Sequence, residues 1–111
     1  MTALGVPTAG SRALPPAQDW VPSPGSPGWH VRALLETAGF ATQLMRVEPG
    51  TVSAPHAHDR IEQVYVIDGS LYDDDGSEHP AGSFIVRAAG AIHGGGSRDG
   101  ATLLVVYGDV R

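Results

Sequence analysis

The sequence contains no cysteine and no lysine. Without thiols the chain can form neither a disulfide nor a thiolate metal site, so any metal must be held by imidazole and carboxylate groups. Seven arginines stand against 12 acidic side chains, which gives a formal net charge of -5 at pH 7. This balance excludes the basic surface that nucleic acid or an anionic membrane requires, and we expect neither as a partner.

Long apolar runs are also absent. No stretch approaches the roughly 18 apolar residues of a membrane span, and the N-terminus lacks a secretory signal, so we expect a cytoplasmic protein. A chain of 111 residues has room for one domain. Its 15 glycines and 9 prolines separate the apolar residues into short runs. This pattern predicts an all-β fold, a small β-barrel or double-sheet jelly roll of seven or eight strands.

The N-terminal part is rich in proline. Residues 1–28 hold six of the 9 prolines and cannot form a helix. We predict a flexible segment over residues 1–18 and a barrel domain over residues 19–111. Trp20 is expected to anchor the proline-rich arm, either on its own sheet or on a partner subunit, because a large aromatic in such an arm is usually buried. The chain is accordingly expected to form a homodimer through this arm or through an exposed sheet.

Alternating apolar and polar residues predict an antiparallel pair of strands over residues 29–37 and 40–47, joined by a turn at Ala38-Gly39. Residues 61–67 are β-branched and apolar on both faces, which predicts a strand covered on both sides. Asp68-Gly69 is then expected to turn the chain.

The C-terminal half predicts two further strands, over residues 83–87 and 101–107. Residues 73–76 form a polar hairpin tip, and no acid completes a calcium loop there. The glycine-rich run at residues 94–100 is expected to be a flexible turn, because no lysine or helical pattern follows that would make it a phosphate cradle.

One stretch carries metal-binding chemistry. In an extended strand His56 and His58 point the same way, with Cα atoms about 6.6 to 7 Å apart, so two imidazoles can converge on one ion. Glu62 returns to the same side if Asp59 and Arg60 make a short bend. Its carboxylate is a hard oxygen ligand suited to a divalent metal.

A pair of ligands from one strand cannot enclose an ion, so a facing strand must supply another. His93 is the candidate, because a barrel can bring it opposite residues some 35 positions earlier. Three imidazoles and a carboxylate would leave two positions open on an octahedral ion, an arrangement typical of catalytic rather than structural sites.

These residues carry a resemblance. The pattern Gly50-x5-His56-x-His58-x3-Glu62-x6-Gly69 is similar, residue for residue, to the first conserved motif of the cupin superfamily. The resemblance implies a cupin double-stranded β-helix, the jelly-roll barrel of RmlC-like cupins.

The pattern Gly82-x7-Gly90-x2-His93 resembles the second motif of the superfamily. Two positions depart from it: Ala88 replaces the usual proline and Ser97 the usual asparagine. Neither position ligates metal in the family, so the departures concern the shape of the loop.

Within the superfamily the chain looks most like the ChrR-type cupins, on the run Met45 to Gly50, the strand from Glu62 to Gly69, and residues 73–76 with 81–87. That group includes zinc-binding sensor domains of anti-sigma factors and iron-dependent dioxygenases that cleave β-diketones. The resemblance implies that the metal ligands are His56, His58, Glu62 and His93. In the diketone-cleaving enzymes only three histidines carry the iron.

The resemblance implies one divalent metal, with iron(II) or zinc(II) favoured over manganese or nickel, and a small-molecule substrate. The favoured function is an iron(II)-dependent dioxygenase acting on a small oxygenated substrate, such as a β-diketone or hydroxy-ketone. The alternatives are a noncatalytic zinc-binding sensor module and a metal-dependent isomerase of sugar-derived acids.

Four further side chains are candidates for the pocket lining: Gln43, Arg46, Tyr65 and Arg87. The two arginines lie in apolar strands, where an unpaired charge is costly, so each either faces solvent or pairs with a carboxylate or a substrate anion. Met45 and Tyr107 are expected in the core or at the cavity wall. The remaining histidines, His30 and His79, are expected to be solvated, which leaves one candidate site.

Overall fold

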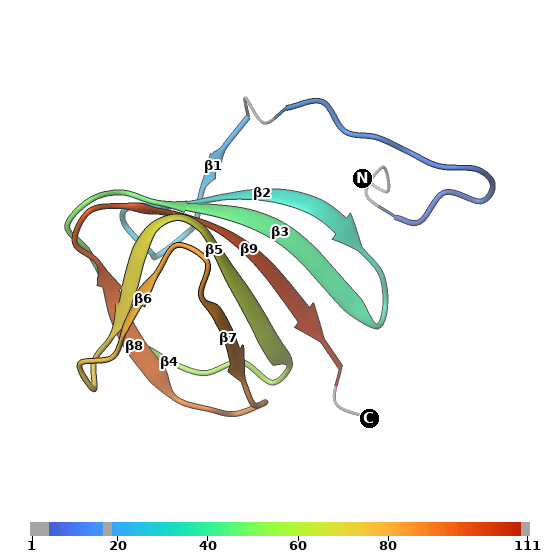
Figure 1. Ribbon diagram of the computed structural model, residues 1–111. Coiled ribbons are helices and arrows are strands. Elements are labelled where there is room, and N and C mark those ends of the chain that lie inside the picture. Colours follow the sequence, from blue (N-terminus) through green and yellow to red (C-terminus); the bar gives the residue numbers. More distant parts are fainter. Residues whose placement is uncertain (1–4, 17–18, 110–111) are drawn as a thin grey trace.

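The computed structural model describes residues 5–16 and 19–109, which form nine strands and no helix (Figure 1). The strands are β1 (Val21–Pro22), β2 (Trp29–Glu36), β3 (Phe40–Val47), β4 (Thr51–His56), β5 (Ile61–Asp73), β6 (Glu78–Pro80), β7 (Phe84–Arg87), β8 (His93–Ser97) and β9 (Ala101–Gly108). Their order is β1-β2-β3-β9-β5-β8-β4, with β6 and β7 paired to β5. Every pair is antiparallel, and the sheet curls on itself, so the all-β prediction is confirmed with nine strands instead of seven or eight.

β2 and β3 form the predicted antiparallel pair. Their turn is closed by the hydroxyl of Thr37, which accepts hydrogen bonds from the backbone N–H groups of Gly39 and Phe40. β3 then pairs along its whole length with β9. Alternate residues of both strands therefore face the interior, as the period of two in a strand requires.

β5 is longer than predicted, because the chain does not turn at Asp68-Gly69. The register with β9 shifts between Val66 and Asp68, and Gly69 follows with a φ of 74°, so the strand bends and continues. A Cβ at Gly69 would lie 1.9 Å from the carbonyl oxygen of Gly100, a close approach that only glycine permits. One strand thus contributes to both halves of the barrel.

The outer face of β5 is open, so the prediction that both faces are covered is wrong. Tyr65 and Ile67 are 44% and 46% exposed, and their neighbours Phe84 and Val86 on β7 are 59% and 61% exposed. These apolar residues stay exposed, because the described part of the chain has no helix or second layer that covers this face.

Residues 94–97 of the glycine-rich run lie in a buried strand, and only residues 98–100 form the predicted turn. Gly94, Gly95 and Gly96 lie in β8 between β4 and β5. A Cβ on Gly96 would stand 2.1 Å from the carbonyl oxygen of Thr51, and one on Gly95 would stand 1.9 Å from that of Tyr72. The glycines let three backbones approach closely, a requirement that composition alone did not reveal.

The core lies between the curled halves of the sheet. Its buried apolar residues come from β3, β5 and β9 and are Val47, Val64, Val66, Leu71, Ala101, Leu103 and Val105. Trp29, Met45, Ile85 and Tyr107 pack against them. The apolar cluster occupies one part of the interior, and polar side chains of the same strands occupy another.

The arm before β2 contacts the body of the protein. The guanidinium of Arg46 lies 4.4 Å from the centre of the Trp20 ring, so Trp20 is anchored on its own sheet. The predicted division at residue 18 stays a prediction, since residues 17–18 lie outside the described part of the chain. No helix among the described residues has the length and apolar character needed to cross a membrane.

Candidate metal centre

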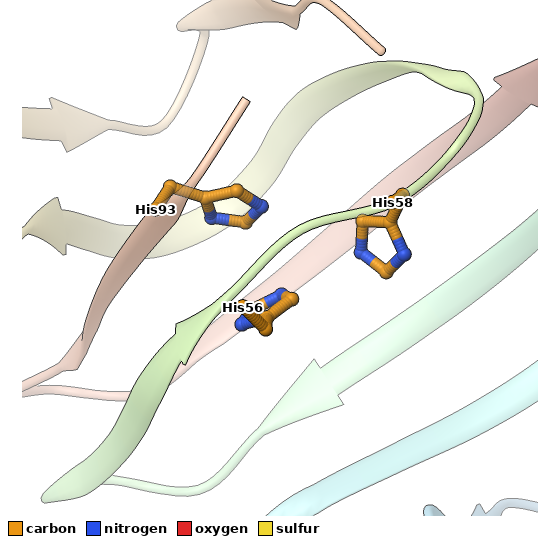
Figure 2. A group of neighbouring side chains, drawn as sticks. All are labelled: His56, His58 and His93. Carbon is orange, nitrogen blue, oxygen red and sulfur yellow. The ribbon is translucent and has the colours of Figure 1, made fainter. Parts of the chain in front are cut away.

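Three histidine rings converge in the structure, with His56 exposed and His58 and His93 half-buried (Figure 2). His56 ends β4 and stands directly opposite His93, the first residue of β8, with ring centres 4.3 Å apart. His58 lies 5.1 Å from His56 and 6.0 Å from His93 by the same measure. The structure thus brings the two histidines of one stretch together with a third from a facing strand.

The route by which His58 reaches the cluster differs from the prediction. β4 ends at His56, and His58 belongs to the connection that follows it, so the two side chains are not held by one regular strand. The predicted bend at Asp59 and Arg60 is present and leads into β5. The ring of His58 rests beside that of Tyr107, with centres 5.0 Å apart, and this contact helps to orient it.

The three side chains fit a metal ion. One nitrogen from each of His56, His58 and His93 lies within 4.8 Å of the other two. Metal–nitrogen bonds of about 2.1 Å place ligand atoms about 3.0 to 4.2 Å apart, so little movement is needed. Nδ1 of His56 lies 3.0 Å from the carbonyl oxygen of Ala54, which places the ring proton there and leaves Nε2 with a free lone pair.

The carboxylate of Glu62 on β5 lies next to two of the histidines. Glu62 is 6% exposed, with Oε1 3.5 Å from Nε2 of His93 and Oε2 3.9 Å from Nε2 of His58. Glu62 Oε1 and His93 Nε2 are both buried and have no hydrogen-bond partner. Buried polar atoms normally have partners, and a cation between these two would satisfy both. The donor set therefore suits a divalent metal.

The strand register places two more polar residues beside Glu62. Arg87 of β7 and Tyr107 of β9 are its cross-strand partners on either side. Burial, together with the negative charge of Glu62 and a hydrogen bond to it, raises the pKa of Tyr107 well above its usual value, so this hydroxyl keeps its proton. Arg87 has its Nε 3.4 Å from Oε1 of Glu62.

Burial and neighbouring charges shift the pKa values of two side chains at this site. Burial, reinforced by the positive charge of Arg87, lowers the pKa of His93, so its imidazole is neutral at pH 7 as metal binding requires. Burial opposes the ionisation of Asp73, but hydrogen bonds from Arg87 and His79 outweigh it and hold the pKa of this carboxyl below its usual value.

A cavity of about 460 Å³ includes the three histidines and Glu62 in its wall. Its apolar side is formed by Trp29, Met45, Val64, Leu71 and Leu103. The polar side includes Arg87, Asp73 and Tyr107. A small molecule in this cavity would therefore meet both the histidines and apolar side chains.

Of the four side chains proposed for the pocket, only Arg87 lines it. Tyr65 lies on the outer face of β5, and Arg46 is exposed on the outer face of β3 against Trp20. Gln43 lies on the inward face of β3, opposite the buried Val105 of β9, but it does not line the cavity. Strand parity excludes Tyr65 and Arg46, and the sequence did not show which parity faces inward.

The two histidines outside the cluster are paired, not simply solvated as expected. His30 lies 2.6 Å from the Glu48 carboxylate, and Nε2 of His79 lies 3.2 Å from the Asp73 carboxylate. Asp73 itself was not identified as a site residue, because the supposed turn at residues 68–69 hid its place on the inner face of β5. The shift of register between Val66 and Asp68 reverses which residues face inward, so counting alternate positions from Glu62 would not have found Asp73.

The profile of a family described as "ChrR Cupin-like domain" matches residues 12–111. The chain belongs to this family. The RmlC-like cupin resemblance of the sequence is thereby confirmed, and so is the cupin fold. No curated protein matches the sequence at a significant level.

Solved structures agree with this fold. An acetylacetone dioxygenase from Acinetobacter johnsonii has a TM-score of 0.79 at 19% identity, covering 91% of this cupin and 75% of that chain. The polyketide cyclase RemF from Streptomyces resistomycificus has a TM-score of 0.75 at 24% identity, covering 93% and 82%.

A chain from the complex of Rhodobacter sphaeroides SigE with the anti-sigma ChrR has a TM-score of 0.69 at 17% identity. The alignment covers 82% of this cupin but only 49% of that chain, so this cupin matches about half of it. The neighbours thus include enzymes and a regulatory protein. At these identities the likeness establishes the fold alone.

Proposed function

We propose that this cupin binds one divalent metal through His56, His58 and His93, with Glu62 as a fourth ligand, and is an iron(II)-dependent dioxygenase of a small oxygenated substrate. The observation that carries the proposal is the convergence of three imidazoles in the wall of a cavity large enough for a ligand. Clefts of about 300 to 1,000 Å³ are typical of small-molecule sites, and this one falls within that range.

When bound, the metal would supply Lewis acidity and, as iron(II), a centre for dioxygen chemistry. The protein's own residues bind and orient the substrate. Trp29, Met45 and Leu71 offer an apolar wall that keeps water from one end of the substrate. Tyr107 retains its proton beside Glu62 and so can donate a hydrogen bond to the carboxylate.

The charges around the cavity favour an anionic substrate. Glu62 and Asp73 carry two negative charges and Arg87 carries one positive charge, so these three side chains sum to -1. A divalent ion held by neutral imidazoles changes the local total to +1. A monoanion that chelates through two oxygens, such as the enolate of a β-diketone or a hydroxy-ketone, would balance it.

A noncatalytic zinc-binding sensor is the second candidate. The description of the family and the similarity to the SigE–ChrR complex favour it. The same four ligands would hold zinc(II), with manganese or nickel as further options. The third candidate, a metal-dependent isomerase of sugar-derived acids, uses the same cavity and differs in consuming no oxygen.

Metal analysis of protein purified without added metal, followed by oxygen uptake with a panel of β-diketones, separates these functions. The dioxygenase proposal expects bound iron and uptake that disappears in the His56→Ala/His58→Ala variant. His30→Ala is the matched control, because His30 is paired with Glu48 away from the cavity. Tightly held zinc without oxygen uptake would leave the sensor, and turnover without oxygen consumption would leave the isomerase.

We also propose that the protein is a cytoplasmic homodimer. The exposed apolar side chains of Tyr65, Ile67, Phe84 and Val86 on neighbouring strands support self-association, because such patches commonly mark interfaces. Sedimentation velocity measures the oligomeric state directly, and a monomer at all concentrations contradicts the dimer.

A further inference from the structure

Arg87 lies between two carboxylates in the cavity wall. Its Nη1 and Nη2 donate to Oδ2 and Oδ1 of Asp73 over 3.2 and 3.0 Å, a bidentate pair. Its Nε points to Oε1 of Glu62 at 3.4 Å, and its side chain is only 13% exposed. Bidentate arginine–carboxylate pairs have a defined geometry, so Asp73 sets the direction in which Nε points.

Asp73 is itself held in place. It ends β5, where its backbone pairs with Gly95 of β8, and its N–H donates to the carbonyl oxygen of Ser77 at 2.9 Å. His79 of β6 lies 3.2 Å from the same carboxylate. The hairpin of β5 and β6 therefore fixes Asp73, and through it the guanidinium of Arg87.

We propose that Asp73 and Arg87 are positioning residues that hold the Glu62 carboxylate against the three histidines. This inference rests on the proposed metal site. Glu62 sits on β5 directly opposite Arg87, and its Oε1 lies 3.4 Å from the Arg87 Nε and 3.5 Å from the His93 Nε2. The other oxygen, Oε2, lies 3.9 Å from the His58 Nε2. The Nε has no hydrogen-bond partner of good geometry, which leaves it available to Glu62 when the carboxylate turns toward a metal.

The same contacts argue against a role for Arg87 in binding a substrate anion. Both of its terminal nitrogens are already bonded to Asp73, and the remaining Nε faces Glu62. A substrate carboxylate or enolate would have to displace the buried Glu62 carboxylate or the half-buried Asp73 carboxylate to reach it. Arg87 thus acts on the metal centre through Glu62 and not through the substrate.

The test uses the affinity of the protein for zinc(II), measured by competition with a chromophoric chelator and without any substrate. Partners behind metal ligands are typically worth about 10- to 100-fold in metal affinity, and we expect losses of this size for Arg87→Gln and Asp73→Asn. Arg87→Lys keeps the positive charge but cannot form the bidentate pair with Asp73, so we expect its zinc affinity to lie between those of Arg87→Gln and the wild type. Arg32→Gln is the matched control, because Arg32 of β2 is about as little exposed, at 10%, and pairs with Asp19 in the arm before β1.

A double-mutant cycle with Glu62→Gln distinguishes positioning from a general structural effect. If Arg87 acts through Glu62, Arg87→Gln lowers zinc affinity less than about 3-fold once Glu62 is replaced. The visible spectrum of the cobalt(II)-substituted protein should change alike in Arg87→Gln and Glu62→Gln. Asp73→Asn and Arg87→Lys provide the same comparison if Arg87→Gln does not fold.

Equal losses of zinc affinity in both backgrounds, or no loss from Arg87→Gln, would overturn the positioning role while leaving the metal site intact. Wild-type protein that binds no zinc, or a His56→Ala/His58→Ala variant that binds it unchanged, would overturn the metal site as well. The two failures are therefore distinguishable.

Discussion

Replacement of Gly96 by alanine tests how closely β8 must approach its neighbours. The new Cβ would stand 2.1 Å from the carbonyl oxygen of Thr51 and 2.9 Å from the hydroxyl of Tyr72. Contacts of a Cβ below 3.0 Å are essentially never observed, so the backbone of β4 has to move away. Gly96 has no positive φ, so the expected effect is purely steric.

The size of the effect follows from the contacts that the movement disturbs. Overpacking a well-packed interior costs about 1–3 kcal/mol. Gly96 and Gly95 stand opposite Val52 and Ser53 on β4, and loss of two ladder hydrogen bonds there adds about 1 kcal/mol each. We therefore expect the free energy of unfolding to fall by about 3–5 kcal/mol. For a chain of this length the melting temperature would fall by about 12–25 °C.

Thermal unfolding followed by circular dichroism provides the assay, with two further variants as a series. Gly39→Ala is the control, because no atom lies within 4 Å of a Cβ there and its φ is not positive. Gly94→Ala should fall between the two, since its nearest contacts are 3.1 Å away. Zinc affinity should decrease with Gly96→Ala, because β4 and β8 also carry His56 and His93. A Gly96→Ala protein that melts within 2 °C or so of the control would refute this account of the triple-glycine strand.

Two other predictions concern charged side chains outside the histidine cluster. Burial of Asp73 opposes its ionisation, but the hydrogen bonds from Arg87 and His79 leave the folded pKa below the usual value of 3.8. The ionised form therefore contributes stability above about pH 4 that is lost as the pH falls through the folded pKa. Denaturant unfolding should show Asp73→Asn less stable than wild type at pH 7, and the difference in unfolding free energy should narrow below pH 4. A difference that does not change with pH would contradict the lowered pKa of Asp73. Arg46→Ala should remove the stacking on Trp20 and cost about 0.5–1 kcal/mol in the same assay, and an unchanged free energy would show that the arm is anchored otherwise.

The candidate ligand residues could be proposed from the sequence because their spacing carries the chemistry. His56, His58 and Glu62 occur within seven residues, and in a chain without cysteine they and His93 were the only credible set. The all-β fold was likewise predictable, since prolines and glycines interrupt every apolar run before a helix of ordinary length could form. Both inferences depend on local order in the chain, which a sequence shows directly.

Only the tertiary structure showed which residues lie next to these candidate ligands. Asp73 and Arg87 are 14 positions apart, and they meet because β5 continues past Gly69 and curls into the other half of the sheet. A shift of register at this bend reverses which residues face inward, so parity could not be followed through it from the sequence.

The glycine triplet shows the same division. As a sequence, Gly94 to Gly96 has the composition of a flexible turn, and only the presence of β4 on one side and β5 on the other makes it a buried strand. Glycine is permissive by itself, and its neighbours in space determine whether that freedom is used for flexibility or for close packing. Local spacing thus pointed to the candidate metal ligands of this cupin, and long-range strand pairing determined what surrounds them.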